Sequence, residues 1–358
     1  MQKYLRRSIL RLAAMLLTLT ILLTGCTIGS GNSWVYRFGD TTMPAGVYLS
    51  CQISAISDAH NVYGDPMINT RDLLKATIEG VPATQWIESR TDAYARMYFL
   101  VEQRFDEMSL VYDEVMEAAT AYVLENAWAQ ESGFYIQNNI SKESVAIAAM
   151  NNTKLQEIFV KTYGEGGERE VSDDELKAAF EENYLYFNAF TVPKFAAAPE
   201  STDKSAEELN AEMQALIEEY LTRLEAGEKI EVLAYELDKK QAEIYGEDPE
   251  AIEEYPDGVL ETFIPPVYRD YYDQELVNAV SAAENNAFGV IEASNIFYIY
   301  QKVDIAETGS YDVYRSSVLM ELKMSEFNKE LLEQAAYLDV EVNKSAVNKY
   351  KVSKLDLS

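Results

Sequence analysis

The chain has 358 residues, of which 60 are acidic and 30 are basic, and its formal net charge is −30 at pH 7. Such a negative field opposes binding to nucleic acid and to anionic lipid head groups. The single histidine and the two cysteines exclude histidine-rich metal sites and zinc sites of the Cys/His type. We therefore expect no nucleic acid and no metal ion among the ligands, and no motif indicates a cofactor.

The N-terminal residues are typical of an exported lipoprotein. After a positively charged start, the stretch from Leu12 to Leu23 is apolar but too short for a comfortable transmembrane helix. Leu23–Cys26 (LTGC) resembles the bacterial lipobox, in which small residues precede a cysteine that takes a diacylglycerol. The pattern predicts a signal peptide over 1–25, lipidation of Cys26 and a Gly/Ser/Asn-rich tether over 26–33. Such an anchor attaches the protein to the extracytoplasmic face of the cell membrane without spanning it.

Cysteine and histidine are common catalytic residues, but Cys51 and His60 are each expected to have a structural role. With Cys26 lipidated, Cys51 is the only free thiol, so an intrachain disulfide is excluded and Cys51 is expected to be a small core residue. His60 stands beside Asn61 and Gly64 in an apparent loop, which favours a surface or turn histidine over a member of a catalytic relay.

Residues 34–163 are predicted to be almost entirely helical, without a period-two pattern. The boundary signals are Thr41 and Thr42 as N-caps before Pro44, Pro82 at the start of a long helix, a helix over 110–131 stopped by Ser132–Gly133, and Ser141 at the start of a stretch interrupted near Asn151–Asn152. The first part of the mature chain is therefore expected to be a helical domain.

A glycine-rich joint follows. Gly164–Gly167 carries three glycines in four residues, and it has neither a preceding strand nor the lysine of a phosphate-binding loop. Beyond it, capping boxes are predicted at Ser172 with Glu175 and at Ser205 with Glu208. We expect a strand over 187–195 between them, and then an amphipathic helix that ends at Gly227.

The remaining elements are expected to alternate between helices and strands. The ranges are 228–238 for a short helix or turn, 271–280 for a helix, 287–305 for a strand hairpin and 311–338 for a long helix. The acidic stretch 246–258 shows no clear element, and its carboxylates lack the spacing of an EF-hand.

Tyrosine is abundant, with 25 copies, and two clusters are candidates for contacts with other chains. Amphipathic rings bind exposed apolar chain at low entropic cost, and the alternative is ordinary packing in the core. The candidate binding residues are Tyr184, Tyr186, Tyr268, Tyr271 and Tyr272.

The order of elements resembles the SurA/PrsA family of extracytoplasmic foldases, in which a parvulin-type prolyl isomerase domain interrupts a helical chaperone domain. The segments that carry the resemblance are Val171–Leu176 as the entry helix, Asn188–Val192 as the first parvulin strand, Leu224–Ile230 as a helix end and Ile296–Ile305 as the closing strand. The resemblance implies an α+β, predominantly α fold with a small parvulin-like α/β module inserted in a helical domain. It implies domains over 34–167 and 168–305, with residues 306–358 returning to the helical part.

The parvulin pattern carries histidines on its first and closing strands. Phe190 stands at the first of these positions, and Tyr298 or Ile299 stands at the second. The hydrogen-bonding cluster of the family is therefore expected to be degenerate, with no catalytic residues, although an isomerase-like scaffold persists.

These observations predict a membrane-anchored chaperone that binds unfolded or nascent exported polypeptides without prolyl isomerase catalysis. Two alternatives stay open, an active peptidyl-prolyl isomerase and a solute-binding or assembly lipoprotein. Solute receptors usually have a sheet-rich first half, which the helical pattern after residue 34 does not match. The sequence does not specify the oligomeric state.

Overall fold

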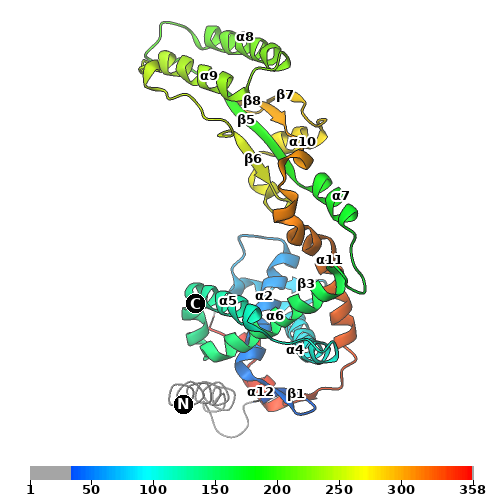
Figure 1. Cartoon of the computed structure of the whole chain (residues 1–358). Helices are drawn as coiled ribbons and strands as arrows, with labels where there is room; N and C mark the ends of the chain where they lie inside the picture. The colour runs from blue at the N-terminus through cyan, green and yellow to red at the C-terminus, as the bar shows by residue number, and fades with distance from the viewer. Residues whose placement is uncertain (1–33, 357–358) are drawn as a thin grey trace, which may run out of the picture. The chain divides into compact units, whose positions relative to one another are not determined.

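The computed structural model describes residues 34–356, and within that range the fold is α+β and predominantly helical, as predicted. The chain divides into two compact units (Figure 1). The first unit consists of the residues up to Glu170 and those from Lys323 onward, and the second unit is Val171–Leu322. Cys26 and the predicted tether lie outside the described residues. The predicted domain boundaries at 167/168 and 305/306 refer to domains that fold independently. The division into compact units does not test them, so they stay a prediction.

The first unit is built on helices α2, α4 and α6, which pack against one another (Figure 1). Its helices are α2 (Ala45–Tyr63), α3 (Thr70–Leu73), α4 (Ala83–Glu107), α5 (Glu114–Gln137), α6 (Lys142–Tyr163), α12 (Lys344–Lys349) and the 3-10 turn η4 (Val352–Lys354). Two small sheets accompany them, formed by β1 (Trp34–Phe38), β2 (Thr41–Pro44) and β9 (Glu341–Val342), and by β3 (Thr77–Ile78) and β4 (Val81–Pro82).

The start of this unit differs from the prediction, because Thr41 and Thr42 belong to strand β2 and cap no helix. Helix α2 begins at Ala45, directly after Pro44, without a side-chain cap. The aromatic and β-branched residues of β1 favour a strand, but β1 gains its second partner only from β9, about 300 residues later in the chain, where Tyr36 is opposite Val342. A pairing of this range leaves no local pattern in the sequence.

Two predicted helix interruptions are also wrong. Helix α5 continues through Gly133 to Gln137, where Trp128 and Tyr135 stack at 5.8 Å between ring centroids. Helix α6 is continuous through Asn151, whose amide donates to the carbonyl of Tyr98 at 3.1 Å. Tertiary contacts thus outweigh local preferences that cost roughly 1 kcal/mol per residue.

The second unit holds a four-stranded antiparallel sheet in the order β6-β5-β8-β7. Its strands are β5 (Leu185–Pro193), β6 (Glu261–Ile264), β7 (Phe288–Glu292) and β8 (Ile296–Lys302). Its helices are α7 (Asp173–Asn183), α8 (Ala206–Glu225), α9 (Ile230–Tyr245) and α10 (Gln274–Ala282), with 3-10 turns η1 (Pro249–Ala251), η2 (Pro266–Tyr271) and η3 (Ile305–Thr308).

Several predicted features of this unit are confirmed. Ser205 and Glu208 form the predicted capping box of α8, and Ser172 accepts the backbone N–H of Glu175 at 3.2 Å at the start of α7. The β7–β8 hairpin lies inside the predicted range. Strand β6 was missed, and α9 is longer than the predicted 228–238 because the predicted turn continues as helix as far as the αL cap at Gly246.

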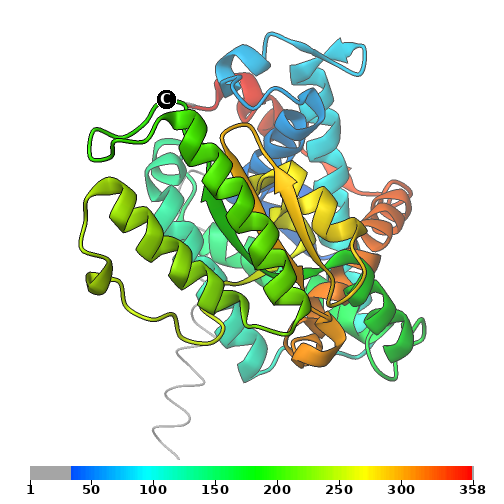
Figure 2. The same ribbon diagram turned by 90° about the horizontal axis from the view of Figure 1, so that it is seen from above.

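Helices cover both faces of the sheet. Helices α8 and α9 lie over one face, where Figure 2 shows them in front of the strands, and α10 contacts the other. The core under α8 and α9 contains Phe190, Val192, Met213, Tyr220, Leu233 and Ile299, and the core under α10 contains Leu185, Phe187, Ile264, Val277 and Tyr300. Side chains of one strand therefore alternate between two separate cores.

Helix α11 (Tyr311–Ala335) corresponds to the predicted long helix, and its residues are divided between the two units. In the first unit, Phe327 of this helix contacts Phe159 and Tyr163 of α6, with ring centroids 5.5 and 5.9 Å away. Between residues 34 and 356, none of the helices has the length and apolarity needed to cross a bilayer.

Candidate functional site

The three residues at which the resemblance leads us to expect histidine positions are divided between the two sheet faces. Phe190 is directly opposite Ile299, and Thr191 is opposite Tyr298. Phe190 and Ile299 are 9% and 0% exposed in the core under α8 and α9, whereas Tyr298 packs on the α10 side. The structure therefore brings Phe190 together with Ile299 and separates it from Tyr298.

On the sheet face under α10, Tyr298 lies near the carboxylate of Asp273. Asp273 caps α10, since its Oδ1 accepts the backbone N–H groups of Glu275 and Leu276. Burial and, next, the neighbouring Asp273 carboxylate raise the pKa of Tyr298. Tyr298 is therefore a neutral hydroxyl at pH 7, and this face has no histidine because the single histidine of the chain is His60.

His60 and Cys51 belong to the first unit, and their contacts indicate a role in the structure of that unit. His60 lies in the last turn of α2, not in a loop as predicted, and its Nε2 is 3.0 Å from Thr70 Oγ1. Burial raises the pKa of Cys51 to about 12, so its thiol stays protonated and unreactive. No group of three or more His, Cys, Asp or Glu side chains among residues 34–356 is arranged to hold a metal ion.

The predicted tyrosine clusters have contrasting environments. Tyr184 is 2% exposed, donates its hydroxyl to Glu321 at 3.0 Å and packs on Phe180 at 4.8 Å between ring centroids. Tyr186 is half-buried and donates to Glu261 at 2.5 Å. Tyr184 is thus part of the core of the second unit and presents no binding surface, which corrects the expectation for this residue.

The tyrosines near η2 are on the surface. Tyr268, Tyr271 and Tyr272 are 55%, 83% and 38% exposed, and the neighbouring Val267 is 65% exposed. We call these four residues the tyrosine segment. The rings of Tyr268 and Tyr271 lie 6.2 Å apart between centroids. Exposed apolar side chains of this size in one short segment indicate a surface for contact with another molecule.

The backbone of the tyrosine segment is held in place although its rings are exposed. Arg269 Nη2 donates to the carbonyl of Asn183 at 2.9 Å, and the Gln274 amide donates to the carbonyls of Arg269 and Tyr272 at 2.9 and 3.0 Å. Tyrosines on a fixed backbone lose little entropy when they bind. The sequence indicated the tyrosines, but it did not distinguish these exposed rings from the buried Tyr184.

A groove in the first unit was not predicted. It has a volume of about 890 Å³, and its lining residues come from α2, α4, α6 and α11. The apolar part of the lining is Met97, Leu155, Met324 and Leu332, and the polar part includes Asp58, Arg90, Tyr94, Asn328 and Lys329. Sequence periodicity shows which helix faces are apolar but not where two such faces leave a space between them.

The polar side of this groove is built around Asp58. Arg90 Nε donates to Asp58 at 2.7 Å, and the Tyr94 hydroxyl donates to the same carboxylate oxygen. Burial and, next, this hydrogen bond raise the pKa of Tyr94 to about 12. The groove therefore presents neutral, hydrogen-bonded phenol and flexible methionine side chains at physiological pH.

No protein-family model and no curated protein sequence matches the chain. Among solved structures, it is similar to the foldase protein PrsA from Streptococcus pneumoniae, with 12% identity and a TM-score of 0.37 over 71% of this chain and 86% of that chain. It is also similar to the foldase protein PrsA from Lactococcus lactis, with 14% identity and a TM-score of 0.34 over 88% of this chain and 97% of that chain. For PrsA from Bacillus subtilis the values are 15% and 0.29, over 73% and 89%. Identity and TM-score are low in all three comparisons.

Proposed function

We propose that this protein is a membrane-anchored extracytoplasmic chaperone that binds unfolded exported polypeptides and does not catalyse prolyl isomerisation. The observation that carries the proposal is the tyrosine segment, which exposes Val267, Tyr268 and Tyr271 on a backbone braced by Arg269 and Gln274. An unfolded client presents apolar side chains and unpaired backbone groups. A tyrosine side chain can bind both kinds of group, because its ring has an apolar face and its hydroxyl forms hydrogen bonds.

Charge supports the choice of an unfolded polypeptide as the ligand. Because the first 25 residues carry four positive charges and no acidic residue, the formal net charge from Cys26 onward is −34. Asp270, Asp273 and Glu275 stand in and beside the tyrosine segment. Lysine and arginine side chains of a client are attracted to such carboxylates and to the faces of tyrosine rings, and like charge keeps chaperone molecules apart.

The groove of the first unit supports the same function. Met97 and Met324 are unbranched and polarisable, so they adapt to side chains of different shapes. A lining that combines methionine, leucine and tyrosine suits a ligand without a fixed sequence. We propose that the groove is a second contact surface for the same kind of client.

The absence of isomerase catalysis is proposed from the distribution of polar groups. On the sheet face under α10, Tyr298 lies near Asp273, the N-cap of α10. On the other face, Phe190 and Ile299 are part of the core. Neither supplies the hydrogen-bonded histidine pair of the parvulin pattern. Fold similarity alone gives no reason to assign the activity.

The proposal is tested by suppression of client aggregation. The variant Tyr268→Ser/Tyr271→Ser/Tyr272→Ser should need at least about threefold more protein for half-maximal suppression, because truncating exposed aromatic anchors removes most of their contact energy. The matched control is Tyr122→Ser/Tyr337→Ser, at positions that are 72% and 90% exposed. Equal suppression by the two variants would reject the tyrosine segment as the binding surface, and absence of suppression by the wild type would reject the chaperone function.

A further inference from the structure

The segment after β9 has a charge opposite to that of the whole chain. Between residues 343 and 356 it carries Lys344, Lys349, Lys351 and Lys354, and its single acidic residue is Asp356. We call these four lysines the lysine face. Lys344, Lys349 and Lys354 are exposed, and Lys351 is half-buried. A cluster of basic residues in a chain of net charge −30 is a candidate contact surface for an anionic partner.

The lysine face has no carboxylate partners within the described part of the chain. Lys349 Nζ lies 5.0 Å from the ring centroid of Tyr350, and Lys354 Nζ donates to the carbonyl of Asn348 at 2.7 Å. By contrast, other lysines of the first unit form ion pairs; examples are Lys75 with Asp72, Lys142 with Glu125 and Lys154 with Glu102. The four ammonium groups therefore keep their charge available for an external partner.

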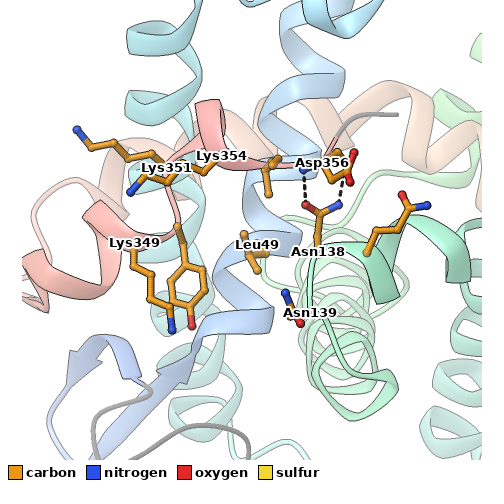
Figure 3. A pocket seen from close by; sticks show the side chains of 10 residues that line it. Leu49, Asn138, Asn139, Lys349, Lys351, Lys354 and Asp356 are labelled. Atoms are coloured by element: carbon orange, nitrogen blue, oxygen red, sulfur yellow. Dashed lines mark hydrogen bonds between the residues drawn. The ribbon is translucent and has the colours of Figure 1, made fainter.

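Hydrogen bonds fix the segment that carries these lysines to the helices of the first unit. The side chain of Asn138 donates to the carbonyl of Asp356 at 2.9 Å and accepts its N–H at 2.7 Å (Figure 3). Gln52 Nε2 donates to the carbonyl of Tyr350 at 2.7 Å, and Val352 is fully buried. The segment that carries the lysine face is thus held against the first unit, and Lys349, Lys351 and Lys354 line one pocket there.

A pocket of about 200 Å³ opens at this surface, between Asn138 and Asn139 at the end of α5 and the lysines that follow α12 (Figure 3). The lysines are not needed as caps for α5. The carbonyls of Phe134, Tyr135 and Ile136 already accept backbone N–H groups at 3.1, 2.8 and 3.1 Å. Neutralising the helix end therefore does not explain the lysine cluster.

The position of the lysine face relative to the predicted anchor suggests the partner. Asn343 donates its backbone N–H to the carbonyl of Val35 at 2.9 Å and its side-chain amide to the carbonyl of Trp34 at 3.0 Å. The neighbouring Lys344 is therefore fixed beside Trp34, which is eight residues after Cys26. Eight residues span at most about 28 Å when fully extended. A lipid on Cys26 would keep this end of the first unit close to the bilayer.

We propose that the lysine face binds the anionic head groups of the membrane in which Cys26 is anchored, and so sets which side of the first unit faces the bilayer. This inference rests on the anchor in the proposed function. Each lysine near an anionic surface strengthens binding by roughly fivefold at moderate salt. Charges more than about 10 Å away are screened, so the acidic remainder of the protein does not cancel this local attraction but disfavours other orientations.

The test uses the full lipidated chain on vesicles of phosphatidylcholine alone or of equal parts phosphatidylcholine and phosphatidylglycerol. A water-soluble amine reagent modifies the lysines, and mass spectrometry measures the rate at each one. We expect the lysine face to react severalfold more slowly on the vesicles with phosphatidylglycerol, with the difference lost at high salt. Lys75 and Lys229, which form exposed ion pairs elsewhere, should react equally on both.

A matched pair of variants separates the lysine face from net charge. In Lys344→Gln/Lys349→Gln/Lys351→Gln/Lys354→Gln, amide hydrogen exchange of residues 343–356 should be the same on both kinds of vesicle. In the control Arg71→Gln/Lys75→Gln/Lys204→Gln/Lys229→Gln, which has the same net charge, exchange should still be slower with phosphatidylglycerol.

The outcomes are distinct. Failure of the wild type to co-float with phosphatidylcholine vesicles would overturn the anchor and with it this proposal. Co-flotation without any dependence on phosphatidylglycerol would overturn the lysine face alone. Protection by a soluble anionic polymer but not by phosphatidylglycerol would also overturn it, and would point to a polymer as the ligand.

Discussion

Phe190 on β5 and Ile299 on β8 are directly opposite each other, and both side chains are buried under α8 and α9. The ring of Phe190 also lies 6.2 Å from that of Tyr220 on α8, measured between centroids, at an interplanar angle of 62°. Phe190, where the resemblance to the foldase family led us to expect a histidine position, is therefore part of an apolar core. The role of Phe190 in this protein is packing.

This packing predicts the effect of Phe190→Ala on stability. Removing a ring that is 9% exposed should lower the free energy of unfolding by about 3 kcal/mol, since a cavity remains between the sheet and α8. Urea denaturation followed by circular dichroism measures the change. Thr191→Ala, at the exposed neighbouring position, should change the same quantity by less than about 0.5 kcal/mol. Equal effects at the two positions would contradict the assigned sheet faces.

The second prediction concerns catalysis. The protein should leave the slow, proline-limited refolding phase of a client unchanged while it reduces aggregation of that client, because Tyr298 and Asp273 offer no imidazole. Tyr298→Phe and Asp273→Ala should likewise have no effect on this phase. Saturable acceleration in a proline-peptide assay that is lost in Tyr298→Phe would instead identify a catalytic site under α10.

The third prediction concerns the groove of the first unit. Met97→Gln/Met324→Gln should weaken client binding by roughly three- to tenfold, since two apolar contacts are replaced by amides. Isothermal titration with a chemically unfolded client measures this change. The control is Met67→Gln/Met108→Gln, at exposed positions that do not line the groove. If both double variants bind as the wild type does, the groove is not a client site.

The fourth prediction concerns alkaline pH. The pKa of Tyr94 is about 12 in the folded protein, compared with 10.0 for an ordinary tyrosine. A raised pKa means that the folded state favours the protonated form, so this contribution to stability is complete below pH 10 and is lost as the pH rises towards 12. In Tyr94→Phe, the fall in unfolding free energy over this interval should be shallower.

The variant should also be less stable at pH 8 by about 1 kcal/mol, because Asp58 loses a hydrogen bond. Urea titrations at a series of pH values test both effects, with the exposed Tyr122→Phe as the control. An unchanged slope in Tyr94→Phe would show that burial and the contact with Asp58 do not raise the pKa of Tyr94 in solution.

The fifth prediction concerns export. Cys26→Ala removes the acceptor of the lipid, so the precursor should remain uncleaved or be mislocalised. Cell fractionation and the mass of the protein report both properties. Normal processing together with unchanged membrane retention would contradict the lipoprotein assignment.

Local patterns predicted local structure well. The Ser205–Glu208 capping box and the β7–β8 hairpin depend on residues within a few positions of each other, and both are present. Features that depend on distant partners were missed. Strand β1 is completed by β9, and Asn151 stays helical because Tyr98 and Glu102 on α4 accept its amide hydrogen atoms.

The candidate site was predicted in part for the same reason. The tyrosine pattern identified Tyr268, Tyr271 and Tyr272, but it also included Tyr184, whose burial depends on Phe180 and on Glu321 far along the chain. The groove lies where four helices meet. The lysine face lies near the predicted anchor because Asn343 forms a hydrogen bond with the backbone of β1. Neither relationship is visible in a linear sequence.

The division of α11 between the units has a consequence for the order of folding. The residues of the second unit are contiguous and end at Leu322, so all of them emerge before the chain is complete. The first unit still lacks Phe327, which packs on Phe159, and also the β9 strand that pairs with β1. A chain that emerges from its N-terminus can therefore fold the second unit before the first unit is complete. The first unit lacks these core contacts until the last few tens of residues have emerged, so it is the part of the chain that stays unfolded longest.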